Sequence, residues 1–154
     1  MTAEKRKPHD RINELENKVA RARSTLFAAK KAEEFQSVGM KCRECLLLLT
    51  EKMAEPCLVP EGQETPQRGN FIQWCELIAA YFAPGGSNER LRSHLRDISK
   101  STWQLVSWLT HAQHAGKLDG SIAITATENV VDSFIMAAAR HGSVKVAKRG
   151  KTSD

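Results

Sequence analysis

The chain has 154 residues, of which 41% are apolar and 27% charged, and its formal net charge is +5. This length and composition are typical of a single globular domain and exclude a disordered or fibrous chain. The start, MTAEKRKPHD, is charged and no apolar segment follows it. We therefore expect no signal peptide, no association with a membrane and a cytoplasmic location.

The basic residues are concentrated near the two ends. Residues 1–31 carry nine Lys or Arg against four acids, whereas residues 32–69 carry four against seven, and the last residues are basic again. We interpret residues 1–9 as a basic tail, residues 10–142 as one helical domain and residues 143–154 as a basic disordered tail. Basic ends suit binding to nucleic acid or to an acidic partner, or serve solubility alone.

Apolar residues at helical spacing predict two long helices in the first third of the chain. The first begins at the N-cap Asp10 and turns inward Ile12, Leu15, Val19, Leu26 and Phe27. The second runs from about Ala32 to Ala54, with Phe35, Val38, Cys42, Cys45, Leu46, Leu49 and Met53 on its apolar side. In a cytosolic protein we expect free thiols, with Cys45 and Cys75 buried as small apolar groups.

The segment Pro56–Gly69 holds three prolines and two glycines without periodicity and is predicted to be a loop. Asn70 can cap a third helix, which ends at Ala-Pro-Gly-Gly, residues 83–86. Ser87 or Asn88 caps a fourth helix that is expected to continue to about Gly116. Its packing seam is Leu91, Leu95, Ile98, Thr102, Leu105, Leu109 and Ala112.

A fifth helix is predicted from Asp119 or Ser121 to a stop at Gly142. Its inward residues are expected to be Ile122, Ala126, Val130, Phe134, Ile135 and Ala138. No segment shows the sustained alternation of a β-strand. The predicted fold class is therefore all-α, a bundle of four to five helices, mainly antiparallel.

The end of the fourth helix is the most polar place on a well-packed element. Ser107, His111 and His114 stand at positions i, i+4 and i+7, so on a helix they share one face, which Lys100 and Gln104 continue. Two imidazoles beside a hydroxyl and a cation could transfer a proton or hold a phosphate. The histidines are therefore candidate catalytic residues. Alternatively, both are ordinary residues favoured at a helix end by the macrodipole.

The start of the same helix carries a basic cluster. Candidate phosphate ligands are Arg90, Arg92, Arg96 and Lys100. Trp103, two turns beyond Arg96, could stack on a base or on a partner, and Trp108 could face a partner. Alternatively, the arginines form a solvated outer face, Trp103 lies in the core and Trp108 covers the edge of the bundle.

Cys42 and Cys45 have the C-x2-C spacing, and His111 and His114 the H-x2-H spacing, of zinc-ligand pairs. The two pairs could bind one ion only if the second and fourth helices bring them together. However, C-x2-C in a zinc site normally lies on a turn, and here it lies within a helix. No phosphate-binding loop or nucleophile elbow is present either, so we predict no metal and no cofactor.

Residues 105–112, LVSWLTHA, followed by a polar turn that ends in glycine, resemble the late helix of the HEPN family. The resemblance implies a helical bundle of the kind found in prokaryotic toxin–antitoxin, CRISPR-associated and abortive-infection systems. Many such proteins are metal-independent ribonucleases that act as dimers and use an arginine separated from a histidine by four to six residues. His111 matches the family histidine, and Ser107 lies near an expected polar position.

The sequence departs from the family at the arginine, since the corresponding positions hold Gln104, Leu105 and Val106. The resemblance then implies a degenerate member that serves as a dimerisation or nucleotide-binding module beside an active defence component. Three classes of function follow. The chain is a non-catalytic module for dimerisation or protein–protein assembly, a nucleic-acid binder of low sequence specificity acting on RNA or DNA, or a ribonuclease that uses His111 or His114.

Overall fold

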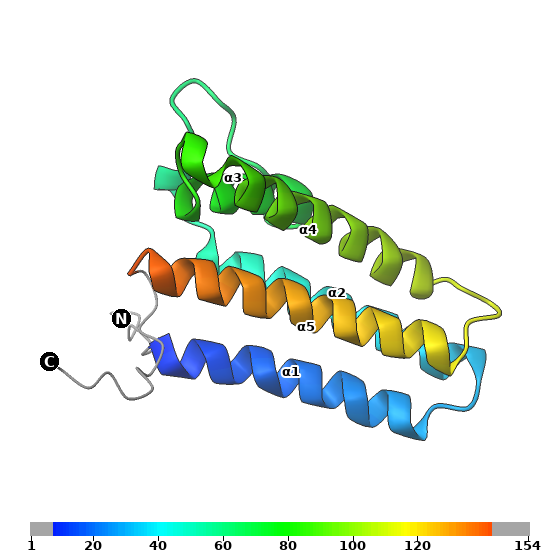
Figure 1. The fold of residues 1–154 in the computed structure, drawn as a ribbon. Coiled ribbons are helices and arrows are strands. Elements are labelled where there is room, and N and C mark those ends of the chain that lie inside the picture. The colour runs from blue at the N-terminus through cyan, green and yellow to red at the C-terminus, as the bar shows by residue number, and fades with distance from the viewer. Residues whose placement is uncertain (1–7, 143–154) are drawn as a thin grey trace, which may run out of the picture.

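The computed structural model describes residues 8–142, with side chains from Ile12 onward, and within that range it contains helices and no strand (Figure 1). The five α-helices are α1 Pro8–Ala28, α2 Ala32–Met53, α3 Phe71–Phe82, α4 Glu89–Leu109 and α5 Lys117–Arg140. Two 3-10 turns, η1 Pro56–Leu58 and η2 Gly86–Asn88, precede α3 and α4. The predicted all-α bundle is confirmed.

Helices α2 and α5 form the centre of the bundle, because each of them packs against all the other helices. On the face turned to the viewer in Figure 1, α5 lies between α1 and α4, with α2 behind it. Helix α3 packs mainly on α4. One broad face of α5 therefore remains outside the core.

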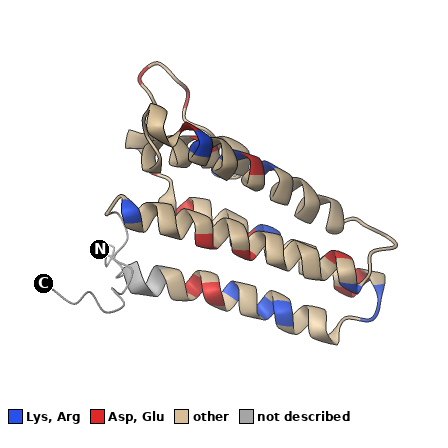
Figure 2. Cartoon of the chain, viewed as in Figure 1, with Lys and Arg blue, Asp and Glu red and all other residues tan. Residues whose placement is uncertain are grey.

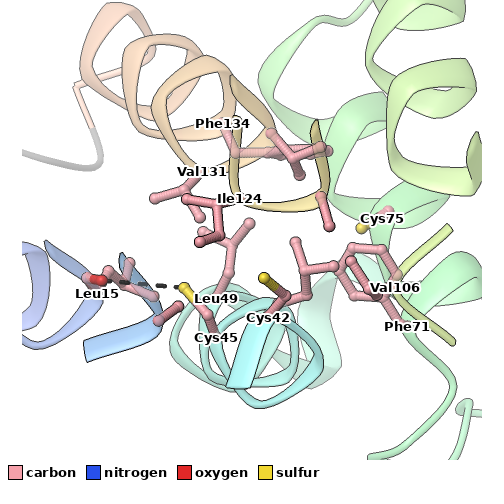
Figure 3. Close-up of a cluster of buried hydrophobic side chains, with 14 of the residues drawn as sticks. Leu15, Cys42, Cys45, Leu49, Phe71, Cys75, Val106, Ile124, Val131 and Phe134 are labelled. Carbon is pink, nitrogen blue, oxygen red and sulfur yellow. Dashed lines mark hydrogen bonds between the residues drawn. The ribbon is translucent and has the colours of Figure 1, made fainter. Parts of the chain in front are cut away.

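The core draws side chains from all five helices and is closely packed (Figure 3). Among its fully buried members are Leu49 of α2, Phe71 of α3, Val106 of α4 and Phe134 of α5. Each large apolar side chain moved out of water contributes roughly 1.5–3 kcal/mol. This burial, rather than helix propensity, holds the bundle together.

Helix α4 ends at Leu109, so the predicted extension to Gly116 is wrong. The chain tightens after Leu109: the amide of Ala112 donates to the carbonyl of Leu109 at 3.2 Å. The side chain of Gln36 on α2 donates through Nε2 to the carbonyl of Ala112 at 3.0 Å. In a longer helix a backbone amide would donate to this carbonyl. Because the donor here lies 76 positions away in the sequence, the local pattern did not show where α4 ends.

The other boundaries differ by a few residues. Helix α1 begins at Pro8, two residues before the predicted cap Asp10. Helix α5 begins at Lys117, because the amide of Gly116 donates to the carboxylate of Asp119 at 2.8 Å and Asp119 thereby caps from the third helical position. The predicted tails, apart from Pro8 and His9, lie outside the described residues.

Two residues that were expected to turn inward face solvent: Phe27 is 85% exposed and Ile122 is 51% exposed. Phe27 is in the last turn of α1, beyond the buried Leu26, and Ile122 lies on the side of α5 opposite the buried Ala123 and Ile124. Leu91, at the first turn of α4, is also exposed. Phe27 and Ile122 lie beside the buried seams of their helices, whereas Leu91 lies on the seam, one turn before the buried Leu95.

Helix α5 is, within the described residues, the one helix long and apolar enough to cross a membrane by length and composition. Of its most apolar window, 44% is buried inside the bundle. A central helix of a globular core has the same length and composition. Its hydropathy is thus explained in part by the core it fills.

Candidate interaction surface

His111 and His114 lie beyond the end of α4, in the segment that leads to α5, and both are exposed. They therefore do not continue the helical face of Ser107, contrary to the prediction. The hydroxyl of Ser107 is buried and is the one buried side-chain polar atom without a hydrogen-bond partner among the described residues. The proton-transfer row expected from the sequence is not assembled.

The basic residues of α4 have different tasks. Arg92 donates to the carbonyls of Ala83 and Gly85 at 2.7 and 3.0 Å, which closes the turn after α3. Arg96 donates to the hydroxyl of Ser93 at 3.0 Å. Arg90 and Lys100 are exposed. Acidic and basic residues are mixed along the described part of the chain (Figure 2), so α4 has no purely basic face.

The two tryptophans of α4 also differ in their surroundings. Trp103 stacks on Phe71, with ring centroids 4.8 Å apart, and the guanidinium of Arg43 lies 4.9 Å from a Trp103 ring. These contacts occupy the indole, so it is a packing residue rather than a stacking platform. Trp108, by contrast, is 52% exposed and available to a partner.

The cysteine pair Cys42 and Cys45 lies in the core, where the thiol of Cys45 points to the carbonyl of Leu15 (Figure 3). Burial raises the pKa of Cys42 to about 11 and that of Cys45 to about 12. In the part of the chain that the structure describes, no group of three or more metal-ligating side chains comes together. The alternative of a zinc site shared with the histidines is therefore not formed.

A cavity of about 530 Å³ lies between the second half of α2, the loop 56–69 and Trp74. The indole nitrogen of Trp74 donates to the carbonyl of Gln67 at 3.1 Å, and the Thr50 hydroxyl donates to that of Leu47 at 3.1 Å. Both buried polar side chains of the wall are thus bonded within the chain. The volume is that of a small-molecule site. The charged groups of the wall, Arg68 and Glu51, pair with each other at 3.5 Å.

The strongest surface feature is a row of residues on the outer side of α5, which we call the α5 stripe. Its six members are Leu118, Ile122, Thr125, Asn129, Asp132 and Met136. They follow one another at intervals of four, three, four, three and four, and all are exposed. This is the spacing of a helix–helix seam, yet here it faces solvent. Sequence reasoning missed it because α5 also carries an inner seam.

A second row, the α1 stripe, lies next to it. Its members Glu16, Ala20, Arg23 and Phe27 are spaced four, three and four apart and are exposed. Arg23 forms an ion pair with Glu128 of α5, and Lys117 of α5 lies over the ring of Phe27 at 5.7 Å. The two stripes therefore form one continuous face.

No family model, curated protein or solved structure matches this chain.

Proposed function

We propose that the chain is a non-catalytic helical module that works in the cytoplasm by assembling with a second protein chain. The observation that carries the proposal is the face formed by the α1 and α5 stripes. Phe27 is 85%, Leu118 71% and Met136 64% exposed, and all three lie on that face. Exposed apolar side chains grouped on one face are typical of protein–protein contact sites. The HEPN-like resemblance at His111, with its missing arginine, supports a non-catalytic role in a prokaryotic anti-phage system.

Sedimentation equilibrium of the purified chain tests the proposal, with and without a short single-stranded RNA, at low and moderate salt. Association that increases with protein concentration and is indifferent to RNA supports an assembly module. The face combines apolar with charged side chains, so moderate salt should weaken the association only slightly.

A monomer that takes up RNA only at low salt would contradict the proposal and favour the nucleic-acid binder, whose contacts would be Arg90, Arg96 and Lys100. RNA cleavage that is lost in His111→Ala, with the helical circular dichroism unchanged, would instead identify a ribonuclease.

A further inference from the structure

We propose that the face formed by the α1 and α5 stripes binds a second copy of this chain, with the two α5 helices antiparallel. This inference rests on the proposed assembly function and names its partner and surface. Three features of the face support this pairing: the symmetry of the α5 stripe, the order of charges along the face, and the size of the face.

The α5 stripe is self-complementary about its centre. In an antiparallel pair related by a two-fold axis at residue 127, Leu118 meets Met136 of the partner subunit, and each Thr125 meets Asn129 of the partner subunit. The first contact is apolar and occurs once at each end of the pair. The contact between Thr125 and Asn129 of the partner subunit pairs a hydroxyl with a side-chain amide. The remaining position sets Ile122 at the level of the partner subunit's Asp132, with Asp132 on the α1 side of the stripe and Ile122 on the opposite side.

The charges follow the same symmetry. Helices α1 and α5 run antiparallel, with Leu26 against Gly120 and Arg23 bonded to Glu128. The basic Arg23 and Lys117 therefore lie towards one end of the face, and the acidic Glu16 and Asp132 lie towards the other.

A two-fold axis reverses this order in the second copy. The axis keeps α1 on the same side in both copies, so Arg23 lies opposite the partner subunit's Glu16 and within reach of the partner subunit's Asp132. Within one chain these two carboxylates and Glu128 repel one another, and the pKa of Asp132 is raised by partial burial and by this repulsion. A cation from the second copy would relieve the repulsion, which gives the arrangement its preferred register.

The face is large enough for a stable dimer. A helix of 24 residues, the length of α5, spans about 36 Å. Two neighbouring helices, each roughly 10 Å wide, present on the order of 700 Å². Standard interfaces bury about 600–1,000 Å² on each partner, and the face falls within this range. A parallel arrangement would instead set each Asp132 at the level of the partner subunit's Asp132 and would carry the two α1 helices to opposite sides, out of reach of these charge pairs. Charge therefore favours the antiparallel arrangement.

The test compares two matched substitutions by sedimentation equilibrium. Ile122 and Met40 are both 51% exposed, but Met40 lies on α2, away from the proposed face. Ile122→Glu should raise the dimer dissociation constant by at least about tenfold, because it places a charge where the α5 stripe buries an apolar side chain. Met40→Glu should leave it within about twofold to threefold. Circular dichroism checks that both variants keep the fold.

Direction is tested by oxidation in a Cys57→Ser background, which removes the exposed native thiol. A mixture of the Leu118→Cys and Met136→Cys proteins should form a covalent dimer, whereas neither protein alone should. Cross-linking of the Leu118→Cys protein to itself would show a parallel pair and overturn the proposal. Association that survives Ile122→Glu but is lost in Met40→Glu or Trp108→Glu would also overturn it, while leaving the assembly function intact. A wild-type chain that stays monomeric overturns it outright, and RNA uptake by that monomer would contradict the assembly function as well.

Discussion

A β-carbon added to Gly39 of α2 would lie 2.8 Å from the backbone nitrogen of Thr110, at the end of α4. No side chain can move to relieve such a contact, because its other atom belongs to the backbone. The two helices therefore approach each other most closely where α4 stops. This approach also holds the segment that carries His111 and His114 in its path towards α5.

Gly39→Ala is expected to destabilise the chain by about 1–3 kcal/mol, since overpacking outweighs the roughly 1 kcal/mol that alanine gains in helix propensity. Urea denaturation followed by circular dichroism measures the free energy of unfolding. Gly120→Ala is the control, because the added methyl would meet only Cδ1 of Leu26, the end of a flexible side chain. The prediction is wrong if Gly39→Ala is as stable as wild type or costs no more than Gly120→Ala.

Trp103→Ala should cost about 2–3 kcal/mol of stability, somewhat below the value for a fully buried tryptophan, because Trp103 loses its stack on Phe71 and the cation over its ring. Trp108→Ala should cost less than about 1 kcal/mol, since half of that side chain is already in water. Thermal unfolding of the two variants side by side measures the difference. Equal losses would contradict the separation of the two residues into packing and surface roles.

Arg92→Gln should destabilise the chain by about 1.5–3 kcal/mol, because two charge-assisted hydrogen bonds to the carbonyls after α3 are lost. Arg90→Gln serves as the control and should change stability by less than about 0.5 kcal/mol. The free energies are measured by urea denaturation. A loss in the Arg90 variant equal to that in the Arg92 variant would show that the turn after α3 does not depend on this guanidinium.

Under native conditions only Cys57 should react with iodoacetamide. Burial raises the pKa of Cys42 to about 11 and those of Cys45 and Cys75 to about 12, so these thiols stay protonated as well as covered. Intact-mass analysis at about pH 8, near the reference thiol pKa, should show one adduct, and four after unfolding in urea. A second native adduct would contradict the buried placement.

The rate of alkylation at Cys57 should depend on the neighbouring Glu55. The Glu55 carboxylate accepts a hydrogen bond from the Cys57 thiol and raises its pKa, which lowers the thiolate fraction at a given pH. Glu55→Gln removes that negative charge and should therefore shift the pH profile of alkylation to lower pH and speed the reaction near neutrality. An unchanged profile would rule out this electrostatic effect.

Local pattern determined most of the helical architecture, because a helix that buries one side repeats apolar residues at 3.6-residue intervals whatever it packs against. The sequence alone thus predicted an all-α bundle, the bounds of α2 and α3 within a residue, and the burial of Cys45 and Cys75. It also marked Trp108 as a candidate for partner contact, and that side chain is exposed.

Only the tertiary structure decided where α4 ends, which tasks its arginines perform and which face of α5 meets water. The end of α4 depends on Gln36 and Gly39, and the task of Arg92 depends on two carbonyls in a preceding turn. Helix α5 carries two seams of the same spacing, and periodicity does not distinguish an inner seam from an outer one. The neighbouring helices cover only one side of α5, so only the inner seam is buried. The outer seam, with Leu118, Ile122 and Met136, stays in solvent.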